Sequence, residues 1–189
     1  MVKVLKIENS IFNEFTYIVI NDKNDCIIID PGSDFESIIY EINKNNLNVL
    51  GVLITHGHFD HIYSCKKLQL CGYKIYISSE DADKCEDLDL SLANSCNVKI
   101  ETFIPDVKID KNDSLLIIGD FKIKVLLTPG HSRGGLSYII ENHLFSGDTL
   151  FEHGYGRYDF YDGNYRELIN SLETLFGFVE NGHVLHPGH

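Results

Sequence analysis

A short apolar strand runs directly into a cluster of histidines, and this junction constrains the fold more than any other feature of the chain. Residues 49–54 are continuously apolar, which is typical of a strand covered on both faces of its sheet. The next seven residues are Thr55-His56-Gly57-His58-Phe59-Asp60-His61. The fold must therefore bury this strand and still present polar side chains at its carboxyl end.

The first half of the chain predicts strands mixed with short helices. The predicted strands are residues 2–7, 15–20, 26–29, 49–54 and 74–77. The predicted helices are residues 33–45, with Ser33 and Asp34 as capping residues, then 60–71, and a weaker one at 78–85. Between the second and third strands, the polar residues 21–25 predict a hairpin.

The second half repeats this mixture after a polar, poorly periodic stretch. Residues 86–113 predict a surface excursion rather than a linker. The predicted strands are residues 115–118, 121–127, 136–140, 143–146 and 184–185, and the predicted helix is 165–176. We therefore expect a single domain over residues 1–189 with an α/β (α+β) fold. Its two αβ halves would pack sheet against sheet with helices outside, as an αββα sandwich.

The spacing within the histidine cluster suits metal binding. In an extended segment, residues at i, i+2 and i+4 point the same way, so His56, His58 and Asp60 can converge. His61 has the opposite parity and can serve a neighbouring position. Imidazole and carboxylate are ligands for zinc, iron or manganese. Solvated loop histidines are the alternative, but three histidines and one aspartate within six positions, at the end of a buried strand, argue against it.

Three further residues could complete two metal positions. His131, Asp148 and His189 each follow a predicted strand and lie in a glycine-containing turn. Taken singly, His131 could be an ordinary loop residue and Asp148 a turn cap. Together with the first cluster, they indicate a shared site.

The joint pattern resembles the metallo-β-lactamase superfamily, and within it the small glyoxalase II-like (hydroxyacylglutathione hydrolase-like) proteins. The motifs His-x-His-x-Asp-His, Thr-Pro-Gly-His, Gly-Asp-Thr-Leu-Phe and Pro-Gly-His occur in that order. The resemblance implies the metallo-β-lactamase fold, an αββα sandwich. It also implies two divalent metal ions, zinc first, with iron or manganese as alternatives. The implied ligands are His56, His58 and His131 for one ion, Asp60, His61 and His189 for the other, and Asp148 as the bridge.

Departures from better-known members narrow the expected activity. Class B β-lactamases usually lack a histidine at the place of His61, and flavodiiron oxidoreductases have a glutamate where His58 stands. Full glyoxalase II enzymes carry a C-terminal helical domain that binds glutathione, which has no counterpart here. Family members continue past the final Pro-Gly-His, so we expect either a sequence that stops short or a missing tail that helps to shape the pocket.

The resemblance implies hydrolysis of thioesters or similar small acyl compounds by a metal-bridging hydroxide, with Asp60 as a catalytic residue that orients the nucleophile. Arg157 lies in a Gly-Arg-Tyr-Asp-Phe segment that resembles glyoxalase II-like and persulfide dioxygenase proteins. It could bind a substrate carboxylate or pair with an acid to support the metal loop, and the pairing role is favoured. Tyr158 and Phe59 are further substrate-binding candidates, although ordinary packing explains both equally well.

Three other functions compete with hydrolysis. One is a persulfide dioxygenase-like oxidoreductase that uses a single iron held by His56, His131 and Asp148, a two-His-one-carboxylate set. Another is a nuclease of the same fold. The third is a metal-binding protein without turnover, which the complete set of seven ligands disfavours.

Composition limits the partners and the compartment. The net charge of −12 repels a phosphate backbone, so we expect a small-molecule substrate and no nucleic-acid partner. No apolar stretch is long enough to cross a bilayer, and the charged N-terminus does not fit a signal peptide, so we expect no membrane partner and a cytoplasmic protein. Five cysteines without a CxxC pair predict reduced thiols. The oligomeric state is left open.

Overall fold

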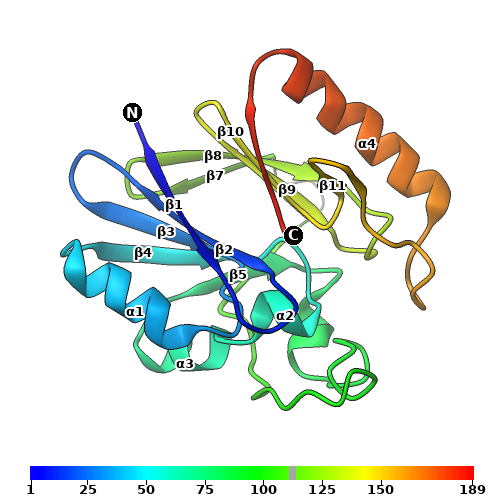
Figure 1. Cartoon of the computed structure of the whole chain (residues 1–189), viewed down its shortest axis with the longest axis horizontal. Helices are drawn as coiled ribbons and strands as arrows, with labels where there is room; N and C mark the ends of the chain where they lie inside the picture. Colours follow the sequence, from blue (N-terminus) through cyan, green and yellow to red (C-terminus); the bar gives the residue numbers. More distant parts are fainter. Residues whose placement is uncertain (111–113) are drawn as a thin grey trace.

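The structure, a computed structural model, describes residues 1–110 and 114–189. In this part of the chain two main sheets pack face to face, with helices on the outer sides (Figure 1). The predicted αββα sandwich is therefore confirmed.

The first sheet has the strand order β1-β2-β3-β4-β5-β6. Its strands are β1 Lys3–Glu8, β2 Phe15–Ile20, β3 Asp25–Ile29, β4 Asn48–Leu53, β5 Ile75–Ser78 and β6 Val107–Ile109. The first three strands are antiparallel, whereas β3, β4, β5 and β6 are parallel. Parallel strands end at one edge of a sheet, so the residues that follow β3 and β4 become neighbours.

The second sheet has the order β13-β10-β9-β8-β7. Its strands are β7 Leu115–Ile118, β8 Phe121–Leu127, β9 Leu136–Ile140, β10 His143–Gly147 and β13 Val184–Pro187. All its pairings are antiparallel except β10 with β13. That parallel pair brings the residues after both strands to one edge. A small hairpin of β11 Leu150–Phe151 and β12 Gly154–Tyr155 lies between β10 and the last helix.

The helices cover the outer faces of the sheets. They are α1 Phe35–Lys44, α2 Phe59–Ile62, α3 Cys65–Leu70, the 3₁₀ helix η1 Ala82–Cys85, and α4 Tyr165–Glu180. Helix α4 packs on the second sheet through Leu168, Leu172 and Leu175, and its first turn is capped by the Asn164 side chain. The core between the sheets contains Tyr17, Ile27, Leu53, Val125, Tyr138 and Phe145. Burial of these faces stabilises the sandwich.

Several elements differ from the sequence prediction. The helix expected at 60–71 is two helices, because the Ser64 amide donates to the Pro31 carbonyl (3.0 Å) instead of continuing the helical pattern. The weak helix at 78–85 shrinks to η1. The excursion 86–113 contains the edge strand β6, and its residues 111–113 lie outside the described part. The β11–β12 hairpin was not predicted, and α4 runs four residues further than expected, to Glu180 rather than Phe176.

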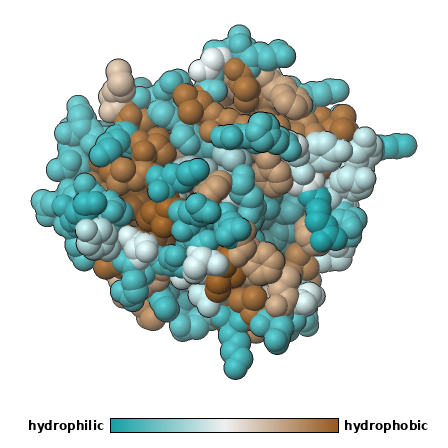
Figure 2. All heavy atoms as spheres, viewed as in Figure 1, coloured by the Kyte–Doolittle hydropathy of each residue, from teal (hydrophilic) through white to brown (hydrophobic). Residues whose placement is uncertain are grey.

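The surface is mixed in character. On the face shown in Figure 2, hydrophilic residues separate several apolar patches. Within residues 1–110 and 114–189, even the longest helix, α4, is too short and too polar to span a bilayer. The five cysteines are free thiols, three of them buried.

Candidate metal centre

Three imidazoles converge between the two sheets. His56 and His58 follow β4 of the first sheet, and His131 follows β8 of the second. One nitrogen of each lies within 4.8 Å of the others, and His58 Nδ1 is 2.9 Å from His131 Nε2. All three residues are buried. We call them the first ligand group.

Asp60, His61 and His189 converge beside these imidazoles as a second ligand group. Asp60 and His61 lie in α2, and His189 follows β13. Asp60 Oδ2 is 3.5 Å from His189 Nε2. His61 is buried, whereas 29% of the His189 side chain is exposed. The second group is therefore more open than the first.

Asp148 lies between the two groups. Its Oδ1 is 3.2 Å from His61 Nε2, while its Oδ2 is 3.6 Å from His131 Nε2 and 3.5 Å from His189 Nε2. The residue follows β10, which pairs in parallel with β13, so Asp148 and His189 reach the same edge. The structure thus brings together all seven residues that the sequence predicts as metal ligands.

Outer hydrogen bonds orient four of the histidines. The outer nitrogen Nδ1 of His131 lies 2.7 Å from the Arg157 carbonyl, and that of His189 lies 3.1 Å from the Phe12 carbonyl. For His61 the partner is the Asp30 carboxylate at 3.0 Å, and for His56 it is the Thr55 hydroxyl at 3.1 Å. When such a partner accepts a hydrogen bond from Nδ1–H, the Nε2 atom carries no proton and is free to bind a metal, as in many metal sites.

The centre fits divalent cations. Among the described residues, the buried Nε2 atom of His56 has no hydrogen-bond partner. A buried polar atom without a partner is costly, and a metal ion would satisfy it. The backbone at residue 188 also lies close to the Asp148 carboxylate. A Cβ at Gly188 would overlap Asp148 Oδ1, so only glycine fits at this position. Five imidazoles and two carboxylates suit zinc, iron or manganese.

The ionisation of the first ligand group and of Asp148 favours metal binding. Burial, together with the neighbouring imidazoles, holds the pKa of His56 well below its usual value, and burial likewise lowers the pKa of His131. Burial alone would raise the pKa of Asp148, but His61 and the other imidazoles outweigh it and lower the pKa. Neutral imidazoles and an ionised carboxylate are the forms that bind cations.

Two buried carboxylates behind His61 were not singled out from the sequence. Asp30 accepts hydrogen bonds from the Thr55 amide and hydroxyl besides facing His61 Nδ1. Glu14 Oε1 lies 3.8 Å from the same nitrogen. Asp30 follows β3, the parallel neighbour of β4, so its position after a buried strand was a usable signal. Glu14 follows an irregular turn and offered none.

The three predicted substrate-binding residues are placed differently from one another. Phe59 is buried, and its ring meets Phe12 edge to face at 5.2 Å. Tyr158 is exposed and lies against Tyr165. The Arg157 guanidinium is exposed, pairs with Asp159 at 2.9 Å and lies over the Phe160 ring. It therefore does not form a buried pair, and only its carbonyl contacts a ligand, His131.

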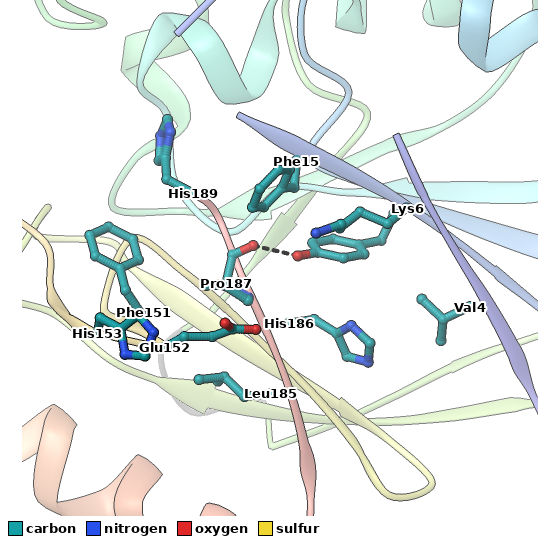
Figure 3. A pocket seen from close by; sticks show the side chains of 11 residues that line it. Val4, Lys6, Phe15, Phe151, Glu152, His153, Leu185, His186, Pro187 and His189 are labelled. Carbon is teal, nitrogen blue, oxygen red and sulfur yellow. Dashed lines mark hydrogen bonds between the residues drawn. The ribbon is translucent and has the colours of Figure 1, made fainter. Parts of the chain in front are cut away.

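A groove of about 540 Å³ opens beside the second ligand group. In Figure 3, Lys6 and Phe15 of the first sheet lie on one side of β13, and Phe151, Glu152 and His153 lie on the other. His189 lies at one end of the groove, 6.1 Å from the Phe151 ring between ring centres. None of Phe59, Arg157 and Tyr158 is among the described residues that line it.

Comparison with known proteins agrees with this geometry. The sequence profile described as "Metallo-beta-lactamase superfamily" matches residues 12–189. The hydroxyacylglutathione hydrolase GloC of Haemophilus influenzae is 32% identical over 182 residues, which cover 94% of this chain and 86% of that protein. The BLEG-1 B3 metallo-β-lactamase structure is 30% identical with a TM-score of 0.93, covering 99% of this chain and 91% of that one. TTHA1623 in a di-iron-bound form is 27% identical with a TM-score of 0.86, covering 98% and 91%.

Proposed function

The chain belongs to the metallo-β-lactamase superfamily, and we propose that it is a dinuclear metal-dependent hydrolase of thioesters or similar small acyl compounds. The observation that carries this proposal is the position of Asp148. One of its oxygens faces the second ligand group, and the other faces both groups. A carboxylate in this position is suited to bind two neighbouring metal ions.

The residues have separate tasks in the proposed reaction. Bound divalent cations would lower the pKa of a water molecule and polarise an acyl oxygen. Asp60 is partly exposed at the second group, where it would orient the attacking water and accept its proton. Asp60 and Asp148 would neutralise only part of the charge of two bound dications, which would leave the centre suited to a developing oxyanion.

The proposed substrate follows from chemistry and space. A thiolate is a good leaving group that needs no general acid. The groove beside His189 gives room for part of a substrate next to the metal centre. The relative from Haemophilus influenzae is named a hydroxyacylglutathione hydrolase. The net charge of −12 supports a small-molecule substrate over a nucleic acid.

The test is hydrolysis with metals restored one at a time. The protein is stripped of metal, reloaded with zinc, manganese or iron, and assayed with S-lactoylglutathione and a simpler thioester. We expect thiol release that depends on metal and is lost in Asp148→Ala. A β-lactam and an RNA serve as control substrates, for which we expect little turnover.

A second candidate uses the same centre with iron. His56, His131 and Asp148 form a two-His-one-carboxylate set, which non-haem iron oxygenases use. Oxygen uptake with glutathione persulfide is therefore measured in parallel. Oxygen consumption without thioester cleavage under any metal would replace the hydrolase proposal with the oxygenase.

A further inference from the structure

A lysine ammonium is buried beside the metal centre, outside the ligand set. Lys84 lies in η1, and its side chain is fully buried. A buried ammonium is costly unless it is paired and hydrogen-bonded. Lys84 Nζ lies 3.2 Å from Asp81 Oδ2 and 2.8 Å from Asp162 Oδ2, and both side chains are almost fully buried. We call Lys84, Asp81 and Asp162 the buried triad, and its contacts explain why a charged group lies at this position.

Asp81 connects two loops that carry ligands of the first group. Its Oδ2 accepts the Gly57 amide at 2.9 Å, and Gly57 lies between His56 and His58. Its Oδ1 accepts the Gly134 amide at 2.9 Å, three residues after His131. The Asp81 carboxylate thus hydrogen-bonds to the backbone of one loop from each sheet, and Lys84 pairs with the same carboxylate.

Asp162 connects a third segment to the same ammonium. It follows Phe160, whose ring centre is 5.0 Å from that of His58 and 5.4 Å from that of His131. Asp162 Oδ2 also accepts the Arg133 amide at 3.2 Å. Because one ammonium bridges Asp81 and Asp162, it joins the segments behind all three imidazoles of the first group.

Two glycines pack closely against Lys84 and Asp81. A Cβ at Gly57 would lie 2.7 Å from Lys84 Cβ and 2.9 Å from its Cδ. A Cβ at Gly134 would lie 2.6 Å from Asp81 Oδ1. The aliphatic stem of Lys84 therefore supports the backbone between His56 and His58, while its ammonium keeps the two carboxylates together.

The geometry points to Lys84 as a positioning residue for the first metal ion. Through Asp81 and Asp162 it fixes the His56–His58 loop against the His131 loop, so the three imidazoles meet the ion in a preset arrangement. This inference rests on the metal binding of the proposed function but not on its substrate. An apolar side chain of similar length would fill the volume and leave two carboxylates facing each other without a cation.

The test compares Lys84→Met with the double variant Lys84→Met/Asp162→Asn. The double variant removes one carboxylate with the ammonium, so it keeps the triad's net charge and favours folding. Zinc affinity is measured by chelator competition, and the visible spectrum of the cobalt-loaded protein reports ligand geometry. We expect a 10- to 100-fold loss of zinc affinity and an altered cobalt spectrum in both variants. The control Lys23→Met breaks an exposed ion pair with Asp120 and should leave both measurements unchanged.

The outcomes separate positioning from charge balance. If the double variant regains thermal stability, zinc affinity and the wild-type cobalt spectrum, Lys84 only balances charge and the inference is overturned. If it regains stability while zinc affinity stays low, the positioning role stands. A wild-type protein that binds zinc but cleaves no thioester removes the proposed substrate and leaves this comparison intact. A wild-type protein that binds no zinc overturns both.

Discussion

The two ligand groups differ in how they are held. His56, His58 and His131 are buried, and they follow central strands of two different sheets. His189 is partly exposed, follows the edge strand β13, and depends on a hydrogen bond to the Phe12 carbonyl. Phe12 and Asn13 both have positive φ (63° and 56°), a conformation that costs non-glycine residues energy. The first ligand group is therefore prebuilt by the sandwich, and the second depends on a strained turn.

The largest effect is expected from removing Asp148, the residue that lies between the two groups. Asp148→Ala should lower hydrolysis by about 10³-fold or more, because both ions lose a ligand and the positive charge is no longer matched. Zinc content, measured by elemental analysis, should fall at both positions. Wild-type zinc content with normal turnover would show that Asp148 does not bridge.

The next test treats the groups separately. His131→Ala should empty the first position and reduce turnover by about 100-fold. His189→Ala should leave one tightly bound ion and weaken the second, because the first group does not need the Phe12 turn. Zinc titration of each variant at equal protein concentration checks this. Equal losses at both positions in both variants would mean that the groups form one cooperative unit.

A smaller effect should come from the residue behind His61. In Asp30→Asn, an amide group can donate where the carboxylate accepted, so the proton on His61 shifts toward Nε2. We expect the second ion to bind about 10-fold more weakly, with a smaller loss at the first, because Asp30 reaches His56 only through the Thr55 hydroxyl. The control is Asp34→Asn, which makes the same chemical change at a carboxylate bound by Ser10 and Ser33. If both variants bind zinc equally well, Asp30 is not an orienting residue.

The smallest effect concerns the strand that carries His189. Burial, with help from His143 and Lys6, lowers the pKa of His186 to about 4 from 6.5. The unfolded chain therefore takes up the proton first, so stability is full above about pH 6.5 and falls as the pH drops toward 4. Partial exposure reduces the effect to about 1 kcal/mol. In metal-free protein, His186→Phe should remove this part of the pH dependence of urea unfolding. An unchanged slope would contradict it.

The sequence predicted the residues of the two ligand groups better than the residues that support them. The ligands lie in short motifs at strand ends, where a histidine cluster is visible without any knowledge of pairing. Asp30 and Glu14 act through strand order, which places them behind His61 only after β2, β3 and β4 have paired. Lys84 lies in the segment that the sequence predicts as a weak helix. The sequence did not reveal its ion pairs, because its partners, Asp81 and Asp162, lie 81 positions apart in the chain.

The fold was predictable for a similar reason. Apolar runs and hairpin signals are local, and they gave the layered sandwich. The break between α2 and α3 was not predictable, because the Ser64 hydroxyl and amide bond to Gly32 and Pro31, which belong to another segment. Strand β6 has only three residues and is a strand because it pairs with β5. Such elements depend on tertiary contacts that no local pattern records.

The link between β2 and β13 has a consequence for folding kinetics. The Tyr17 hydroxyl donates to the Pro187 carbonyl at 2.6 Å, and the Phe15 amide donates to the Gly188 carbonyl at 2.8 Å. The Tyr17 contact spans 170 positions of the chain. A loop of that length forms late in folding, because the entropy lost in closing it must be spent before its contacts form. His189, which follows β13, joins Asp60 and His61 only after this closure. Divalent ions should therefore slow the unfolding rate and leave the folding rate nearly unchanged.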